Sequence, residues 1–144
     1  MKAIVLHGSP RKGMNSDTLA GEFLRGLAET GDHEVKHFYI NEMGIRPCQG
    51  CLHCASSPGH RCAIDDDMSL IYDAYRGADL VVWASPMYWG YITAQMKTVQ
   101  DRWQDLRRAP HIQAPLRVGR EHVQAHSPLL PHRPARGAVQ NLRP

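Results

Sequence analysis

The sequence predicts an α/β fold in which helices cover both faces of a parallel sheet, giving three layers. Apolar runs without alternation, at residues 3–6 and 79–84, are typical of strands buried on both faces. Segments with apolar residues at helical spacing lie between the expected strands. Strands that alternate with helices favour right-handed crossovers and a parallel sheet. With a strand order of 2-1-3, the loops after the first and third strands lie side by side, where such sheets bind ligands.

The first half of the chain predicts a strand, a helix and a second strand. The helix should run from about residue 15 to residue 30, and its apolar face is marked by Leu19, Phe23, Leu24 and Leu27. Residues 34–40 form the second expected strand. His7, at the end of the first strand, is expected to be a histidine near the core with satisfied hydrogen bonds. Residues 41–65 form a long connection that contains all four cysteines.

The second half predicts a helix, a strand and a further helix. Asp65 or Asp66 should cap a helix that ends near Arg76, with its buried face marked by Met68, Ile71, Tyr72 and Tyr75. The strand at 79–84 follows. Thr93 should cap the last helix, which extends to about residue 108 with a buried face marked by Met96, Val99, Trp103 and Leu106.

Length and charge indicate one domain with an unusual end. Residues 1–109 of the 144 carry 12 Lys and Arg and 13 Asp and Glu, whereas residues 110–144 carry five Arg and one acid. No run approaches the ~20 apolar residues of a membrane span. The first strand begins at residue 2 and leaves no room for a signal peptide. We therefore expect a cytoplasmic protein without membrane contact. The basic segment lacks aromatic residues and a helical basic face, which argues against nucleic acid binding.

Two regions are expected: residues 1–109 as the folded domain and residues 110–144 as an atypical segment rich in Pro, Arg and His. Six prolines interrupt this segment too often for a long helix or a central strand, and only residues 116–124 resemble a strand. The chain thus offers three or four strands where this kind of sheet normally has five. We interpret the segment as the product of a truncated or frameshifted gene. The alternative is a natural flexible arm that packs on a partner subunit.

The turn after the first strand has the chemistry of a phosphate site. Ser9 and Ser16 offer hydroxyls, Asn15 offers an amide, and Arg11 can pair with two phosphate oxygens. The start of a helix adds unpaired backbone N–H groups. Asp17 should face away from the anion. The turn matches neither a Walker A loop nor GxGxxG. The alternative is an ordinary strand–helix turn with a polar cap.

Two segments carry a family resemblance. GSPRKGMNSDTL resembles the phosphate loop of the NADPH-dependent FMN reductase and multimeric flavodoxin-like group, and SPMYWGYITAQMKTVQDR resembles its second flavin loop. The resemblance covers about residues 1–108 and implies a flavodoxin-like three-layer fold that binds FMN. It implies that the FMN phosphate is held by Ser9, Arg11, Asn15 and Ser16. It also implies that the ribityl chain and the isoalloxazine ring of FMN are lined by Pro86, Met87, Tyr88, Trp89 and Gly90. Such proteins are usually homodimers or homotetramers.

The residues of the second loop suit a flavin independently of the resemblance. An isoalloxazine ring needs a flat apolar wall and a few backbone donors. Tyr88, Trp89 and Tyr91 supply flat surface, Met87 is adaptable, and Gly90 allows close approach of the backbone. The alternative is that these aromatic residues belong to the core or to a subunit interface.

The cysteines follow the pattern Cys48-x2-Cys51-x2-Cys54-x7-Cys62. Four thiolates suit a [4Fe–4S] cluster or a zinc ion. The spacing resembles the iron–sulfur flavoprotein branch of the same family, in which a cluster passes single electrons to FMN. The remaining alternative is a set of thiols that pack as small apolar side chains.

These features predict an FMN-dependent oxidoreductase. It takes a hydride from NAD(P)H and passes electrons to a quinone, another small acceptor or an iron–sulfur centre. No side chain stands out as a catalytic acid or base. Two alternatives stay open, an iron–sulfur flavoprotein that acts purely in electron transfer and a truncated remnant with little activity.

Overall fold

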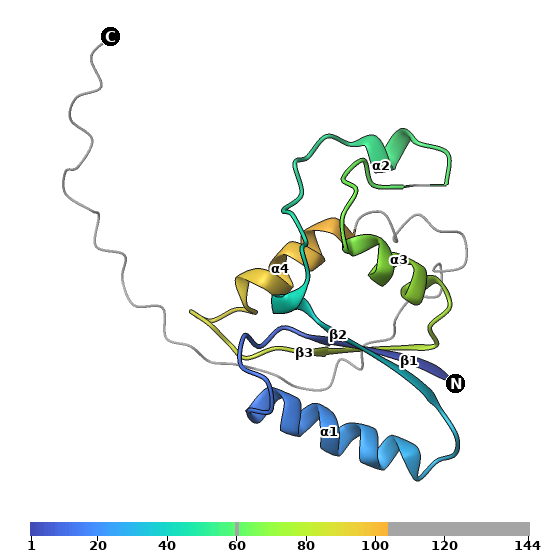
Figure 1. The fold of residues 1–144 in the computed structure, drawn as a ribbon, viewed down its shortest axis with the longest axis vertical. Coiled ribbons are helices and arrows are strands. Elements are labelled where there is room, and N and C mark those ends of the chain that lie inside the picture. The colour runs from blue at the N-terminus through green and yellow to red at the C-terminus, as the bar shows by residue number, and fades with distance from the viewer. Residues whose placement is uncertain (60, 104–144) are drawn as a thin grey trace, which may run out of the picture.

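A computed structural model describes residues 1–59 and 61–103 of the chain. Its centre is a parallel sheet in the order β2-β1-β3 (Figure 1). The central strand β1 (Lys2–His7) pairs with β2 (Glu34–Tyr39) on one side and with β3 (Leu80–Ala84) on the other. The predicted α/β fold with strand order 2-1-3 is therefore confirmed.

Helices lie on both faces of the sheet, so the molecule has three layers (Figure 1). Helix α1 (Asn15–Ala28) covers one face. Helices α3 (Met68–Arg76) and α4 (Ala94–Asp101) cover the other face. The connection from β2 to α3 contains a 3-10 turn, η1 (Ile40–Glu42), and a short helix, α2 (His53–Ser56), which the sequence did not lead us to expect.

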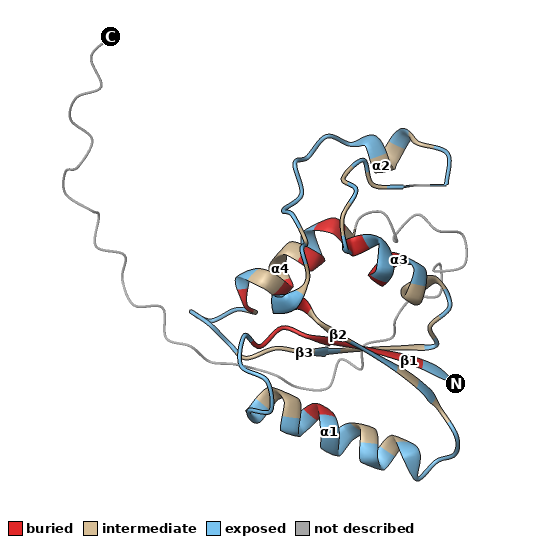
Figure 2. Ribbon diagram, in the orientation of Figure 1, coloured by how far each residue is buried: buried red, intermediate tan, exposed pale blue. Residues whose placement is uncertain are grey.

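The main core lies between the sheet and the pair α3 and α4. Residues Ile4 and Leu6 of β1 point into it and are almost fully buried. The other buried members are Ile40, Met68, Ile71, Tyr72, Met96 and Val99. Burial colours in Figure 2 follow this layer along β1, α3 and α4. Each large apolar side chain buried in this way contributes about 1.5–3 kcal/mol to folding, so the predicted apolar faces of α3 and α4 are what fix these helices to the sheet.

The apolar face predicted for α1 is only partly correct. Leu24 and Leu27 are half-buried and Ala20 is buried, but Leu19 and Phe23 are 72% and 49% exposed. Successive helical residues are separated by about 100° around the axis, and the stripe that meets the sheet is centred on Ala20. Leu19 and Phe23 lie at the flank of that stripe, beyond the sheet surface that α1 covers.

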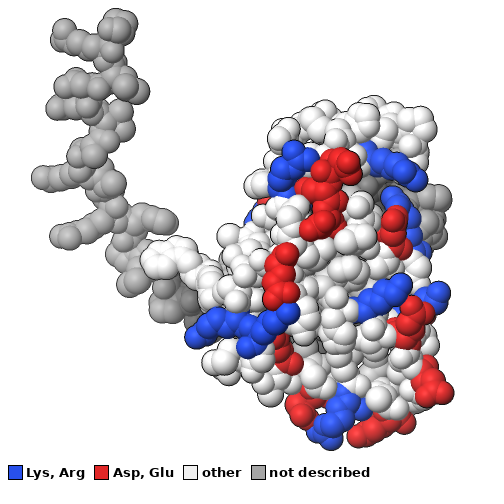
Figure 3. All heavy atoms as spheres, in the orientation of Figure 1, with Lys and Arg blue, Asp and Glu red and all other residues white. Residues whose placement is uncertain are grey.

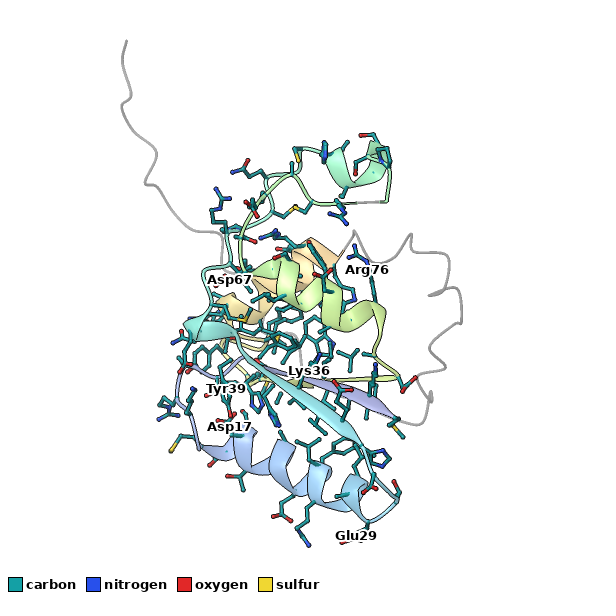
Figure 4. The ribbon with its side chains drawn as sticks, turned by 45° about the vertical axis from the view of Figure 1, so that its right-hand side comes forward. Asp17, Glu29, Lys36, Tyr39, Asp67 and Arg76 are labelled. Atoms are coloured by element: carbon teal, nitrogen blue, oxygen red, sulfur yellow. The ribbon has the colours of Figure 1, made fainter. Side chains whose placement is uncertain are left out.

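The starts of the two later helices differ from each other in how they are capped. Thr93 caps α4 as predicted, because its hydroxyl oxygen accepts a hydrogen bond from the Met96 N–H. Helix α3 begins at Met68 with Asp67 at the N-cap position, one or two residues later than expected. Asp66 accepts from the Met68 N–H, and Asp67 accepts from the Gly44 N–H (2.7 Å), which ties the start of α3 (Asp67 in Figure 4) to the segment after η1.

Several expectations fall on residues 104–144, outside the described residues. They are the end of the last helix with Leu106, the domain boundary at residue 109 and the strand at 116–124. In residues 1–59 and 61–103, no helix combines the length and apolar character needed to cross a membrane. Acidic and basic side chains are interspersed over the face shown in Figure 3.

Candidate functional site

The loops that follow β1 and β3 are joined by hydrogen bonds through Gly8. Its N–H donates to the Ala84 carbonyl (2.8 Å), and its carbonyl accepts from the buried Thr93 hydroxyl (2.7 Å). The Thr93 N–H in turn donates to the Ser85 hydroxyl (3.2 Å). The carboxyl ends of parallel strands are where such sheets bind ligands. The two segments that the sequence singled out therefore begin side by side at the same edge of the sheet.

We expect Thr93→Val to loosen this junction. Valine keeps the shape of threonine but leaves the buried Gly8 carbonyl and the Met96 N–H without their partner, which costs about 1–3 kcal/mol of unfolding free energy. Chemical denaturation of the two proteins measures the loss. Thr93→Ser keeps the hydroxyl and serves as the control. Wild-type stability in Thr93→Val would show that the hydroxyl does not hold the loops together.

The first loop is an exposed polar turn between the buried Ser9 and the start of α1. Ser9 is buried, and its hydroxyl donates to the Arg11 carbonyl (2.9 Å) while accepting from the Arg11 N–H (3.1 Å). The residues from Pro10 to Asn15 are exposed. Asn15 and Ser16 form the first turn of α1, which has no side-chain cap. Arg11, Asn15 and Ser16 are thus gathered at one helix N-terminus, while Ser9 shapes the turn itself.

Asp17 lies between the start of α1 and the sheet (Figure 4), and its carboxylate contacts both His7 of β1 and the Gly13 N–H of the loop. One of its carboxylate oxygens lies 2.8 Å from Nδ1 of His7. The other ring nitrogen of His7, Nε2, lies 3.0 Å from Nδ1 of His37. The prediction that His7 is a satisfied histidine near the core is confirmed. Burial and the neighbouring His7 ring lower the pKa of His37, although Asp17 opposes them.

The second loop is a tight hairpin turn that displays aromatic side chains. Backbone hydrogen bonds join Tyr88 and Tyr91 in both directions (2.7 and 3.0 Å). The residues at the tip, Trp89 and Gly90, have φ of 50° and 80°, a left-handed pair that hairpin turns require. The Trp89 side chain is fully exposed and that of Met87 is 77% exposed. Pro86 is half-buried at the base of the loop.

The arrangement combines two kinds of binding surface. The first loop offers hydroxyl, amide and guanidinium groups at a helix N-terminus, which suits a phosphate dianion. The second offers flat aromatic and apolar surface at the next strand end, which suits a planar heterocycle. The residues fit an elongated ligand with a phosphate at one end and an apolar ring system at the other.

The cysteine-containing connection lies above α3 and α4 in Figure 1. Cys48 and Cys51 are exposed, and Cys54 and Cys62 are half-buried. Within residues 1–59 and 61–103, no three side chains of His, Cys, Asp or Glu converge as ligands for a metal ion. The four cysteines have the donor chemistry of a cluster but are not assembled as one in this conformation. The cluster therefore stays a prediction from spacing and resemblance.

A buried ion pair anchors both ends of this connection. Arg102 and Asp66 side chains are 1% and 6% exposed, with Nη1 of Arg102 2.6 Å from Oδ2 of Asp66. Arg102 also donates to the Arg46 carbonyl (3.1 Å) and the Ile64 carbonyl (3.2 Å), and lies 3.5 Å from the Cys62 sulfur. The sequence signal was a charged residue three positions after Val99 on an apolar stripe, which we did not recognise. Burial alone would lower the pKa of Arg102, but the hydrogen bond to Asp66 together with the electrostatic attraction of Tyr72, Cys62 and Asp66 outweighs burial and raises it.

Asp66 should make the fold sensitive to acid. Burial alone would raise its pKa, but hydrogen bonds from Arg102 and from the Arg46 and Met68 N–H groups outweigh burial and lower it. The ionised Asp66 carboxylate therefore stabilises the folded chain, and this contribution is complete above the ordinary aspartate pKa of about 3.9. It is lost as the pH falls through that value to the lower pKa of the folded state.

The measurement is the unfolding free energy of wild type and Asp66→Asn as a function of pH. The variant should be less stable at neutral pH, and the gap should narrow as the pH drops below about 4. A gap that stays constant down to the acid transition would contradict this assignment.

Two hollows lie away from the joined loops. A cavity of about 210 Å³ beside the cysteine-containing connection is lined by residues that include Arg61, Cys62, Tyr72 and Arg76. A wide, open hollow at the opposite end of the sheet is lined by residues that include Lys2, Glu34 and Asp79. Neither contains a residue of the two loops.

Comparison with known proteins adds an independent finding. Residues 1–117 match the family described as NADPH-dependent FMN reductase. An iron–sulfur flavoprotein of Methanosarcina thermophila is 39% identical over 108 residues, which are 75% of this chain and 55% of that protein. One from Methanocaldococcus jannaschii is 36% identical over 107 residues, 74% of this chain and 54% of that protein.

A Bacillus subtilis protein named as an NAD(P)H-dependent FMN-containing oxidoreductase is 28% identical over 110 residues, 76% of this chain and 56% of that protein. This chain therefore spans about half the length of the relatives that it matches. The matched part contains both loops and the cysteine-containing connection.

Proposed function

Because this chain belongs to the NADPH-dependent FMN reductase family, we propose that it binds FMN and acts as an NAD(P)H-dependent oxidoreductase. The observation that carries the proposal is the junction at Gly8, which brings a phosphate-type turn and an aromatic turn to the same sheet edge. The names of the relatives as iron–sulfur flavoproteins and as an FMN-containing oxidoreductase support the choice of cofactor.

The first loop would hold the phosphate of FMN. Arg11 is exposed, so its guanidinium is available to pair with two phosphate oxygens. Asn15 and Ser16 lie at the start of α1, where the N–H groups of the first turn and the helix dipole favour an anion. Ser9 shapes the turn through its two hydrogen bonds to Arg11, and its O–H would turn from the Arg11 carbonyl to donate to a phosphate oxygen.

The second loop would hold the rest of the cofactor. Pro86 and Met87 leave β3 beside the first loop, so they would contact the ribityl chain. Tyr88, Trp89 and Gly90 form the turn tip, where exposed aromatic surface would cover one side of the isoalloxazine ring and exclude water. Tyr91 is held by a hydrogen bond from its hydroxyl to Gln100 on α4 (3.0 Å), which fixes the hairpin to the body.

Bound FMN would supply the redox chemistry, accepting a hydride from NAD(P)H and returning two electrons to a quinone or another small acceptor. The overall reaction oxidises NAD(P)H to NAD(P)⁺ and reduces the quinone to the quinol with one proton from solvent. No residue of the two loops is assigned as a catalytic acid or base. The protein would position the ring, shield it and set its potential.

A homodimer or homotetramer is part of this proposal. The exposed Trp89 and Met87 side chains are apolar surface beside the flavin ring, and a second copy of the chain would bury them. Size-exclusion chromatography with light scattering, before and after FMN is added, tests this part. A protein that stays monomeric with FMN bound would contradict it.

The test of the proposed function is flavin binding followed by turnover. The purified chain is titrated with FMN by fluorescence quenching and then assayed for NADH and NADPH oxidation with a small quinone. We expect binding at micromolar FMN and quinone-dependent oxidation. Folded protein that ignores FMN at this concentration would overturn the proposal. Binding without turnover, but with reduction by a chemical reductant, would favour a purely electron-transferring flavoprotein.

Arg11→Ala should separate phosphate binding from ring binding. Loss of one charge-assisted hydrogen-bonding group costs about 1.5–3 kcal/mol, which lowers FMN affinity roughly 10- to 100-fold. Riboflavin lacks the phosphate, so its affinity should not change. Arg25→Ala removes the same charge near the far end of α1 and is the matched control. Equal losses for FMN and riboflavin in Arg11→Ala would contradict the role of Arg11.

A further inference from the structure

Beneath the first loop lies a polar network, centred on the buried His7, that the proposed function does not use. His7 is buried at the end of β1, and its ring stacks on Tyr39 of β2 with centroids 4.4 Å apart. Its two nitrogens contact Asp17 of α1 (2.8 Å) and His37 of β2 (3.0 Å). The network therefore links the central strand, its neighbour and the helix that begins the site (Asp17 and Tyr39 in Figure 4).

The direction of the hydrogen bonds follows from the chemistry of the groups. An ionised carboxylate can only accept, so Nδ1 of His7 carries the hydrogen that bonds to Asp17. In a neutral ring Nε2 is then an acceptor, and it receives the Nδ1–H of His37. Asp17 is thus held in one orientation by a side chain that is itself buried and fixed.

The second oxygen of Asp17 reaches back to the loop. It accepts from the Gly13 N–H at 2.7 Å. Gly13 has φ of 71°, and a Cβ built there would meet no atom within 4 Å. No side-chain packing therefore surrounds Gly13, and the Asp17 hydrogen bond is a direct link between the exposed turn and the buried network.

Lys12 supplies a second tether from the same turn. Its ammonium group lies 4.0 Å from the centre of the Tyr39 ring and 2.7 Å from a Glu42 oxygen. Tyr39 is the ring on which His7 stacks. Both tethers thus end on side chains that contact the buried His7 ring, one on Asp17 and one on Tyr39.

We propose that Asp17, held by His7, is a positioning residue that sets the conformation of the turn between Arg11 and Asn15 for phosphate binding. Preorganised donors bind more tightly because less ordering is needed when the ligand arrives. Asp17 itself does not touch the phosphate, since both its oxygens are engaged on the protein side. This inference rests on the proposed function for the identity of the phosphate ligand.

The test compares FMN with riboflavin in three variants. Asp17→Ala removes both hydrogen bonds, and Asp17→Asn keeps an oxygen for one of them without the charge. Thr18→Ala is the neighbouring control, because the Thr18 hydroxyl donates to the carbonyl of Met14, the N-cap residue of α1, and not to Gly13 or His7. Dissociation constants for both flavins are measured by fluorescence quenching, and circular dichroism checks that each variant is folded.

We expect Asp17→Ala to weaken FMN binding about 10-fold while riboflavin binding changes less than about twofold. The ratio of FMN affinity to riboflavin affinity thus falls in Asp17→Ala. It should fall less in Asp17→Asn and stay unchanged in Thr18→Ala. An unchanged ratio in folded Asp17→Ala overturns the inference. If that variant does not fold, the ratio in Asp17→Asn decides in the same way.

A measurement without flavin tests the tether itself. The Gly13 amide should exchange with solvent about 10-fold faster in Asp17→Ala than in wild type or Thr18→Ala, as followed by NMR, since a hydrogen-bonded amide must open before it exchanges. Equal rates overturn the inference. Wild type that binds neither flavin overturns the proposed function instead, and the amide exchange rate still decides whether Asp17 restrains the turn.

Discussion

Arg102→Met is expected to destabilise the folded chain by about 3–5 kcal/mol, because it leaves a buried carboxylate without its partner. Arg102 makes its contacts with Asp66 and with the carbonyls of Arg46 and Ile64 at the base of the cysteine-containing connection. Methionine fills much of the same space but offers no donor. The loss approaches the whole stability of a small domain, which is about 5–15 kcal/mol. Urea denaturation monitored by tryptophan fluorescence measures it.

The control for Arg102→Met is Arg76→Met. Arg76 also pairs with an aspartate, Asp73 at 3.1 Å, but that pair lies at the surface of α3. Exposed pairs contribute about 0–1 kcal/mol, so this variant should unfold close to wild type. Adding Asp66→Asn to Arg102→Met should restore part of the lost stability, since it removes the unpaired charge. Similar small losses in Arg102→Met and Arg76→Met would contradict the anchoring role.

Gly8→Ala is expected to have the second largest effect, on both stability and FMN binding. A Cβ at Gly8 would lie 2.8 Å from Met96 Cε, 3.0 Å from Met96 Cβ and 3.2 Å from Ser85 Oγ. Met96 is fully buried, so it cannot move away without disturbing the core. Overpacking of this kind costs about 1–3 kcal/mol. The junction between the two loops would also open, and FMN affinity should fall at least tenfold, a change of about 1.4 kcal/mol.

Denaturation and FMN titration together check the prediction for Gly8. The matched control is Gly21→Ala, at an exposed position of α1 where a Cβ would meet nothing within 4 Å. Alanine is favoured over glycine in a helix by about 0.5–1 kcal/mol, so this variant should be slightly more stable and bind FMN normally. A Gly8→Ala protein with wild-type affinity would show that the two loops need not be joined.

Much of the fold could be predicted because it depends on local patterns. The buried strand at Ala3 to Leu6 and the apolar faces of α3 and α4 follow from the spacing of their residues. Thr93 was recognised as a cap from its place before a helical pattern. Leu19 and Phe23 were wrongly assigned to the buried face of α1, because helical spacing does not say how wide the covering sheet is.

The candidate site was predicted in its residue types but not in its connections. The pairing of the two loops followed from the strand order, since carboxyl ends of parallel strands meet at one edge. The hydrogen bonds of Gly8 join residues from distant segments, and so do those of Asp17 to His7. No periodicity in the sequence encodes them. Arg102 contacts Arg46 and Asp66, which lie 56 and 36 positions away.

By itself, the sequence determined the α/β class and the two loops that carry the family motifs, because apolar periodicity and turn chemistry are properties of short segments. The strand order 2-1-3 was an expectation for a flavodoxin-like sheet that the structure confirmed. Only the tertiary structure decided that Gly8 joins those loops, that Asp17 faces a buried histidine, and that Arg102 is a buried anchor rather than a surface charge. Each of these depends on which groups, far apart in the sequence, become neighbours in the folded chain. Burial then decides how much a charge or a hydrogen bond between them contributes to stability.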